Sequence, residues 1–273
     1  MHPGEGRLQG DGGDELFGGY RRYSTLSHYH VIRKIALVAR KFNDYLPETA
    51  FNYRIRRYIN AFSAPDLSRT MALLLTIEDQ QNKPTDVFSP QFRMIVDQHD
   101  PFSRYRECQQ YFSGHDIGNQ MSFVDLMIAL PDIYLEKVDR STMSASHEIR
   151  VPFLDHDLVD YIVRLPSRYK IPSGKKKWLL KSAMKDILPH DILYGAKRGF
   201  SVPFGDWLKT SLRQMFFDHL SSFLIKQPGV LDGDHIHRLF DRTIKGTQDH
   251  SFMLWKIFNL VVWANIMKIR FMH

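Results

Sequence analysis

The sequence contains a single cysteine, Cys108, among 273 residues. This excludes an internal disulfide and any zinc or iron–sulfur site built from several cysteines. A long apolar run is also missing: the longest, 252–266, is interrupted by one lysine and two asparagines, whereas a membrane-spanning helix needs about 20 mostly apolar residues. The segment 1–9 lacks the apolar stretch of a signal peptide. We therefore expect a cytoplasmic protein with no membrane partner, in which 252–266 forms a buried helix.

Acidic residues are too few to balance the basic ones. Thirty-seven Lys and Arg against 30 Asp and Glu give a net charge of +7, which attracts anions. No zinc-finger, homeodomain or RNA-recognition signature is present, and the short basic runs at 54–57 and 175–177 are more typical of a solvated face. We expect no nucleic-acid partner. With 43% hydrophobic residues the chain has enough apolar surface for a packed core.

Strand patterns are scarce, because no alternating run is longer than four residues. Helical periodicity dominates instead, as where Val31, Ile35, Val38 and Phe42 recur on one face. The pattern predicts helices over 27–42, 52–62, 72–79, 121–130, 135–146, 176–187, 204–220, 234–244 and 251–268, a helix capped by Asp155 that stops before Pro166, a loop at 82–89 and a break at Pro131.

The segment 10–20, GDGGDELFGGY, has five glycines and three carboxylates in eleven residues. Glycines let backbone N–H groups converge on an anion, and carboxylates can hold Mg²⁺ against phosphate oxygens, so the segment suits a metal-bound polyphosphate. The spacing fits neither a Walker loop, nor a dinucleotide fingerprint, nor an EF-hand. A flexible turn in which Asp14 only caps the next helix is an equal alternative.

Two further clusters carry charge. On a helix, Glu136 and Arg140 form an ordinary surface pair, and Glu148 and Arg150 are expected to be paired around an extended, buried segment 151–154. Lys197 and Arg198 stand together in a glycine-bounded loop that could bring positive charge to a leaving phosphate, with a solvated loop as the alternative. The 13 histidines are scattered, and none is assigned to a metal.

Taken together, the clusters resemble the synthetase domain of glutamine-dependent asparagine synthetases. The matching strings are GDGGDELFGGY at 10–20, LEKVDRSTMSASHEIRVPFLDHDLVDY at 135–161 and AKRGFSVPFGDWLK at 196–209, with the core of the similarity at 10–23 and 130–210. The resemblance implies one partial synthetase domain over 1–273, with C-terminal helices at 221–273. It implies a mainly α fold: the C-terminal helical portion of an α/β, adenine-nucleotide alpha-hydrolase-like (PP-loop ATP pyrophosphatase) domain, with most of its parallel sheet missing.

The resemblance also implies a reaction. Members of the family activate the side-chain carboxylate of aspartate with ATP and Mg²⁺, release pyrophosphate, and let ammonia from glutamine attack the adenylate to give asparagine. The implied cofactors are ATP and Mg²⁺, and the implied partners are aspartate and ammonia or glutamine. Fold-level similarity does not fix the acceptor, so another carboxylate remains an alternative. A non-catalytic helical binding module is the alternative from a different class.

The resemblance assigns roles to residues. Asp11 stands beside the acyl-adenylate, where a carboxylate could help to deprotonate ammonia. Asp14, with Glu15 as the weaker candidate, would bind Mg²⁺ and pyrophosphate, and Lys197 would offset the charge on the leaving pyrophosphate. The positions that line or support the nucleotide site are Gly10, Gly12, Gly13, Asp14, Glu15, Lys137, Asp139, Glu148, Arg150 and Arg198.

Two parts of the family pattern do not occur in this sequence. They are the pyrophosphate loop of the type Ser-Gly-Gly-x-Asp-Ser and the N-terminal cysteine of the glutaminase domain. Residues 1–9 replace the apolar strand that should lead into Gly10. We therefore expect the C-terminal part of a longer enzyme, inactive alone because half of the nucleotide cradle is missing, with an upstream N-terminal polypeptide as its partner.

Overall fold

A computed structural model describes residues 7–45, 50–75, 84–195, 202–246 and 248–271. Contacts between Cα atoms divide the chain into two compact units. Unit 1 comprises Met1–Lys41, Ala61–Leu75 and Phe102–Lys197, and unit 2 comprises Phe42–Asn60, Thr76–Pro101 and Arg198–His273. No helix among the described residues is long and apolar enough to cross a membrane.

Unit 1 is built from short helices around two apolar cores. The larger core includes the fully buried Tyr23, Leu26, Phe62 and Met121, and the smaller one is formed by Leu16, Phe17 and Ile162. Its elements are β1 Arg7–Leu8, α1 Gly13–Phe17, α2 Arg21–Leu26, α3 Tyr29–Ala39, α5 Leu67–Leu75, α7 Ser103–Tyr111, α8 Ile117–Val124, η3 Asp125–Leu135, α9 Glu136–Met143, β2 Ile149–Arg150, η4 Pro152–Leu154, α10 His156–Arg164, α11 Ser167–Lys170, η5 Pro172–Gly174, α12 Trp178–Met184 and α13 His190–Tyr194.

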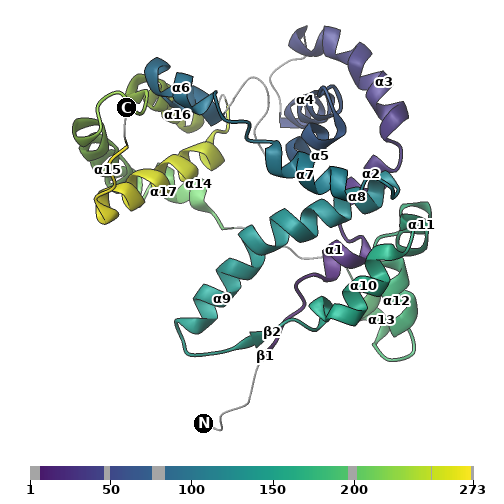
Figure 1. Ribbon diagram of the computed structural model, residues 1–273. Helices are drawn as coiled ribbons and strands as arrows, with labels where there is room; N and C mark the ends of the chain where they lie inside the picture. The colour runs from purple at the N-terminus through teal and green to yellow at the C-terminus, as the bar shows by residue number, and fades with distance from the viewer. Residues whose placement is uncertain (1–6, 46–49, 76–83, 196–201, 247, 272–273) are drawn as a thin grey trace. The chain divides into compact units, whose positions relative to one another are not determined.

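A continuous helical rod, α8, η3 and α9, runs through unit 1 (Figure 1). The break predicted at Pro131 is wrong, because η3 is a π-helix that carries the proline inside it. The backbone N–H of Glu136 donates to the carbonyl of Pro131, five residues back. The wider π turn lets the chain pass a residue that cannot donate a hydrogen bond of its own.

The two strands form a parallel pair, with Arg7 opposite Ile149 and Leu8 opposite Arg150 (Figure 1). The expected fold class, mainly helical with only a remnant of a parallel sheet, is confirmed. Two local expectations are wrong. Residues 7–8 do form a strand before Gly10, and 152–154 is a half-exposed 3-10 turn rather than a buried extended segment.

Several other helices of unit 1 follow their sequence signals, whereas the sequence did not predict α2, α7, α11 and α13. The Asp155 side chain accepts hydrogen bonds from the backbone N–H groups of Asp157 and Leu158, and α10 ends at Arg164, as predicted. The apolar face of α3, however, is exposed: Val31, Ile35 and Val38 are each more than 60% accessible. The opposite face of α3 packs inward through Tyr29 and Ala36.

Unit 2 has one larger apolar core, to which α15 (Arg213–Lys226) and α17 (Ser251–Met267) contribute most of the buried side chains. The helix expected at 252–266 is confirmed, but it is buried on one face only, because Phe252, Trp263 and Ile266 are exposed. The single helix predicted over 204–220 is two helices, of which the first ends at Lys209 and the second begins at Arg213. The described part of the expected loop at 82–89 contains a 3-10 turn. The elements are η1 Arg40–Tyr45, which starts in unit 1, α4 Ala50–Phe62, which ends there, η2 Pro84–Val87, α6 Pro90–Val96, α14 Phe204–Lys209, α15 Arg213–Lys226, α16 Gly233–Ile244 and α17 Ser251–Met267.

Candidate nucleotide site at the glycine-rich turn

The glycine-rich turn connects β1 to α1 and packs closely on η4. Gly12 has a left-handed backbone, φ 84°, and a Cβ placed there would lie 2.5 Å from the Cδ2 atom of Leu154. A Cβ on Gly13 would lie 3.1 Å from the ring of Phe153. Only glycine allows this approach, so the turn has a fixed place against the 152–154 segment.

Asp11 is half-buried on this turn. Its Oδ2 atom accepts a hydrogen bond of 2.7 Å from the Nε2 atom of Gln9. The backbone N–H of Gln9 in turn donates to the carbonyl of Arg150, at 2.9 Å. The side chain predicted to act as a base is therefore oriented by a neighbour that the parallel strand pair anchors.

Asp14 lies in the first turn of α1, but it does not cap the helix: the N-cap residue is Gly12, and no side chain makes the cap hydrogen bond. The alternative in which Asp14 is a simple cap is therefore wrong. Its Oδ1 atom lies 2.9 Å from the Nζ atom of Lys177, and both side chains are partly buried. A Cβ on Gly19 would fall 1.7 Å from that Oδ1 atom and 2.7 Å from the Cε atom of Lys177, so Gly19 makes room for the pair.

The sequence reasoning missed Lys177, since it treated the run 175–177 as a solvated face. Lys175 and Lys176 are exposed, as expected, but Lys177 is not. Its backbone is left-handed, with φ 53°, so Lys177 is the N-cap residue and α12 begins at Trp178. The sequence offered no other signal than the family resemblance over 130–210, a range that includes Lys177.

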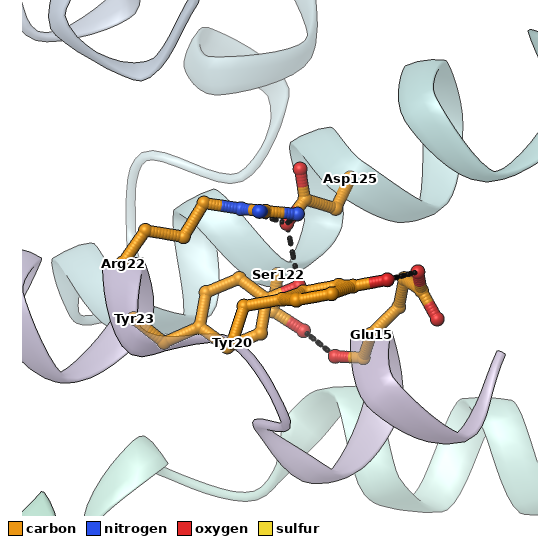
Figure 2. A network of polar contacts seen from close by, with 6 residues as sticks. All are labelled: Glu15, Tyr20, Arg22, Tyr23, Ser122 and Asp125. Atoms are coloured by element: carbon orange, nitrogen blue, oxygen red, sulfur yellow. Dashed lines mark hydrogen bonds and ion pairs between the residues drawn. The ribbon is translucent and has the colours of Figure 1, made fainter. Parts of the chain in front are cut away.

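Glu15 points into the interior of unit 1 (Figure 2). It is 2% exposed, and its Oε1 atom accepts a hydrogen bond of 2.8 Å from the hydroxyl of Tyr20. Burial raises the pKa of the Glu15 carboxyl above its usual range. The backbone carbonyl of Glu15 accepts a second bond, of 2.5 Å, from the hydroxyl of Ser122 on α8. These contacts give Glu15 a structural role that ties α1 to α8.

A second part of the same network joins α2 to the start of η3 (Figure 2). The side chain of Asp125 is fully buried, and its Oδ2 atom accepts bonds from the Nε atom of Arg22 at 2.8 Å and from the hydroxyl of Tyr23 at 2.5 Å. Burial raises the pKa of Asp125 to about 6. Sequence reasoning missed this pair, because its members are 103 residues apart in the chain.

The remaining predicted site residues lie on exposed surfaces or outside the described residues. Lys137 and Asp139 are exposed on α9, where the Nζ atom of Lys137 lies 5.5 Å from the centre of the Tyr134 ring. Glu148 pairs with Arg150 at 3.1 Å, and Glu136 pairs with Arg140 at 2.6 Å, both as expected and all exposed. Lys197 and Arg198 lie outside the described residues.

The described acidic residues do not by themselves fit a magnesium ion. Over the part of the chain that the structure describes, no three His, Cys, Asp or Glu side chains are grouped closely enough to hold a metal. The Asp14 carboxylate carries the Lys177 ammonium group, and the Glu15 carboxyl is bound to Tyr20 in the interior. Mg²⁺ usually keeps several waters and is held by one or two carboxylates together with substrate phosphates, so these residues form no metal site by themselves, and Asp14 would bind the ion only together with a polyphosphate.

Comparison with known proteins places the chain in a family. The model of the asparagine synthase family matches residues 7–265. The chain belongs to the asparagine synthase family. It is 31% identical to a putative glutamine-hydrolysing asparagine synthetase of Mycobacterium tuberculosis, over 95% of this chain and 39% of that protein. It is 26% identical to asparagine synthetase 1 of Bacillus subtilis, over 95% of this chain and 40% of that protein.

A shorter match extends to the asparagine synthetase of Homo sapiens, 30% identical over 146 residues, which is 46% of this chain and 26% of that protein. The chain thus spans about two-fifths of the length of the bacterial relatives. No solved structure matches it.

Proposed function

We propose that the chain is the C-terminal part of an ATP-dependent amide-forming ligase. In the proposed reaction ATP adenylates the side-chain carboxylate of aspartate and pyrophosphate leaves. Ammonia, drawn from glutamine elsewhere in the enzyme, then attacks the acyl-adenylate, and asparagine and AMP are released. Membership of the asparagine synthase family and the printed names of the relatives support this proposal.

The glycine-rich turn carries the proposal. Asp11, oriented by Gln9, would take the proton of the attacking ammonia, and the backbone of Gly10, Gly12 and Gly13 would face the phosphates. Asp14 and Lys177 supply a half-buried ion pair next to that turn. Lys197, in its family position, would offset the charge that builds on the leaving pyrophosphate.

The chain alone is expected to bind nucleotide weakly, because correct positioning needs every phosphate-binding group at once. Activity should appear only when a polypeptide corresponding to the unmatched part of the Mycobacterium tuberculosis relative is supplied. That polypeptide is the proposed partner.

The test is aspartate-dependent exchange of labelled pyrophosphate into ATP. It is measured for the 273-residue chain alone and for the chain mixed with the complementary polypeptide. We expect no exchange alone and exchange in the mixture; Asp11→Asn should keep the exchange and lose asparagine formation from ammonia, because Asp11 is proposed to act after pyrophosphate has left. Replacing aspartate by glutamate or another carboxylic acid tests the acceptor. A mixture that forms a complex but catalyses no exchange with any carboxylic acid would favour the non-catalytic module instead.

A further inference from the structure

A small cavity of unit 1 lies where α8 and α11 meet the C-terminal end of α1. Its volume is about 10 Å³, and Asn119 on α8 and Lys170 on α11 both line it. Gly18, which follows α1, forms part of the wall with a left-handed backbone, φ 73°, and a Cβ there would lie 2.3 Å from the Cγ2 atom of Ile171. A cavity of this volume has room for a single water molecule and for nothing larger.

Lys170 brings an ammonium group to this cavity with too few acceptors. It is 3% exposed, and its one hydrogen bond among the described residues runs 3.4 Å to the carbonyl of Ile162. An ammonium group has three N–H donors, and this distance is long for an N–H···O bond. Asp116 favours the charge on Lys170, but its oxygens accept bonds from the backbone N–H groups of Asn119 and Ser167. At least two of the donors therefore lack an acceptor in the described part of the chain.

Asn119 presents the complementary group to the same cavity. It is 1% exposed, and its Nδ2 atom donates to the carbonyl of Leu165 at 2.7 Å. This bond fixes the orientation of the amide, because turning it over would place two oxygen atoms against each other. The Oδ1 atom is buried and has no hydrogen-bond partner among the described residues. Buried donors and a buried acceptor thus line one cavity without bonding to each other.

The chemistry of the cavity selects its occupant. A buried polar group without a hydrogen bond costs free energy, so both side chains need a partner. The ammonium group repels a metal cation, and the volume excludes a polyatomic anion. A water molecule can accept from Lys170 and donate to Asn119 and to a serine hydroxyl oxygen of the lining, which is the usual set of about three bonds for a buried water. We propose that this cavity is a hydration site, in which one ordered water molecule bridges the Nζ atom of Lys170 and the Oδ1 atom of Asn119.

The bridging water adds a link between elements that surround the glycine-rich turn. Lys170 is the last residue of α11, and Asn119 lies on α8. Ser122, one turn further along α8, also lines the cavity and donates to the backbone carbonyl of Glu15 in α1 (Figure 2). The water would therefore fix α11 on the same helix that holds α1. The site goes beyond the proposed reaction and does not depend on it, because its residues make contacts within unit 1 alone.

The direct test is a crystal structure of the full chain at a resolution that shows ordered water. We expect one water within hydrogen-bonding distance of both the Nζ atom of Lys170 and the Oδ1 atom of Asn119. A direct bond between the two side chains, an ion in place of the water, or a cavity with no ordered peak would overturn the proposal.

Denaturant unfolding tests the bridge in solution, at one neutral pH. In the parent chain Asn119→Leu takes the acceptor from the water and from the ammonium group behind it, whereas in Lys170→Met that ammonium group is already gone. The bond from Asn119 to Leu165 is lost in both backgrounds and cancels. We expect Asn119→Leu to lower the folding equilibrium constant at least about fivefold more in the parent than in Lys170→Met.

The matched control is Asn259→Leu in unit 2, since Asn259 also donates its side-chain amide to a backbone carbonyl but is exposed. Its effect on the folding equilibrium constant should be the same in the parent and in Lys170→Met, within about twofold. Equal losses from Asn119→Leu in the two backgrounds would mean that nothing connects Asn119 to Lys170 and would overturn the proposal.

Discussion

The two units of the chain differ in the side chains that they bury. Unit 2 is organised around a single core of sixteen buried apolar residues, rich in phenylalanine. Unit 1 divides its apolar residues between a core of twelve and one of three, and also buries the carboxyls of Glu15 and Asp125 and the ammonium group of Lys170.

Burying charge is costly unless each charge is paired and hydrogen-bonded. Unit 1 meets that cost with specific partners, and the partners fix how α1, α2, α8 and η3 meet around the glycine-rich turn. Unit 2, although it also buries Arg56, therefore depends more on apolar packing, and unit 1 depends more on specific polar pairs. Mutations should therefore act through packing in one unit and through polar pairing in the other.

The largest expected effect is in unit 2. Phe216 is completely buried, and its ring centre lies 5.2 to 6.0 Å from those of Phe217, Phe240 and Phe258. Phe216→Ala should lower the free energy of unfolding by about 4 kcal/mol, as in other buried aromatic deletions. Hydrogen exchange by mass spectrometry should locate the loss in unit 2. The control Ile225→Ala, at an 80% exposed position of the same helix, should cost less than about 0.5 kcal/mol.

Removing the buried carboxylate of unit 1 should have the next largest effect. Asp125→Ala leaves Arg22 buried without its partner and should cost about 3 kcal/mol or more. The matched control is Asp132→Ala, since Asp132 lies on η3 like Asp125 but pairs with Arg104 in solvent. Breaking this exposed pair should cost less than about 1 kcal/mol. Denaturant unfolding followed through Trp178, the tryptophan of unit 1, gives both values. Similar losses in the two variants would contradict the view that unit 1 depends on buried pairing.

Lys170 predicts a pH dependence of unit 1. It is 3% exposed, and burial lowers the pKa of its ammonium group to about 8. Between this value and the ordinary pKa of 10.5 the unfolded chain holds a proton that the folded chain has lost. The free energy of unfolding therefore increases as the pH rises from about 8 to 10.5, by about 3 kcal/mol at most. This increase is lost as the pH falls back to 8.

The measurement compares denaturant unfolding of the parent chain and Lys170→Met at several values between pH 7.5 and 10.5, with the other titrating groups common to both. At the lowest pH the Lys170→Met variant should have the larger free energy of unfolding. As the pH rises, the parent should gain stability relative to the variant, so this difference should shrink or change sign. A constant difference would mean that Lys170 keeps its proton in the folded chain.

The sequence predicted most of the helices because their signals are local. Asp155 followed by an apolar period gave α10 with its cap and its end. The failures arise where the result depends on more than the local sequence. Pro131 indicated a break, but the π-helix is a backbone solution that depends on packing along the whole rod. The exposed apolar face of α3 shows that periodicity gives a helix but not the surface that covers it.

The site was predictable in part, for a different reason. The glycine-rich turn could be recognised from its composition and family resemblance, and the structure gives its glycines a steric purpose. Lys177 is 163 residues from Asp14 in the chain, and Asp125 is 103 residues from Arg22. No local sequence pattern could therefore have predicted either pair. Whether Glu15 faces a ligand or the core is likewise decided by Tyr20 and Ser122, which only the folded chain brings to it.

The smallest expected effect tests whether the two hydrogen bonds to Glu15 are energetically coupled. Ser122→Ala removes the hydroxyl that donates to the backbone carbonyl of Glu15 and should cost about 1 kcal/mol. Tyr20→Phe should cost a similar amount, since it leaves the Glu15 carboxyl without that donor. Because Glu15 is the common acceptor, the double variant should cost measurably less or more than the sum of the two, by at least about 0.5 kcal/mol in a double-mutant cycle. Strict additivity would mean that α1 is held by packing against Leu16 and Phe17 rather than by the polar network, and unit 1 would then resemble unit 2 more than its buried charges suggest.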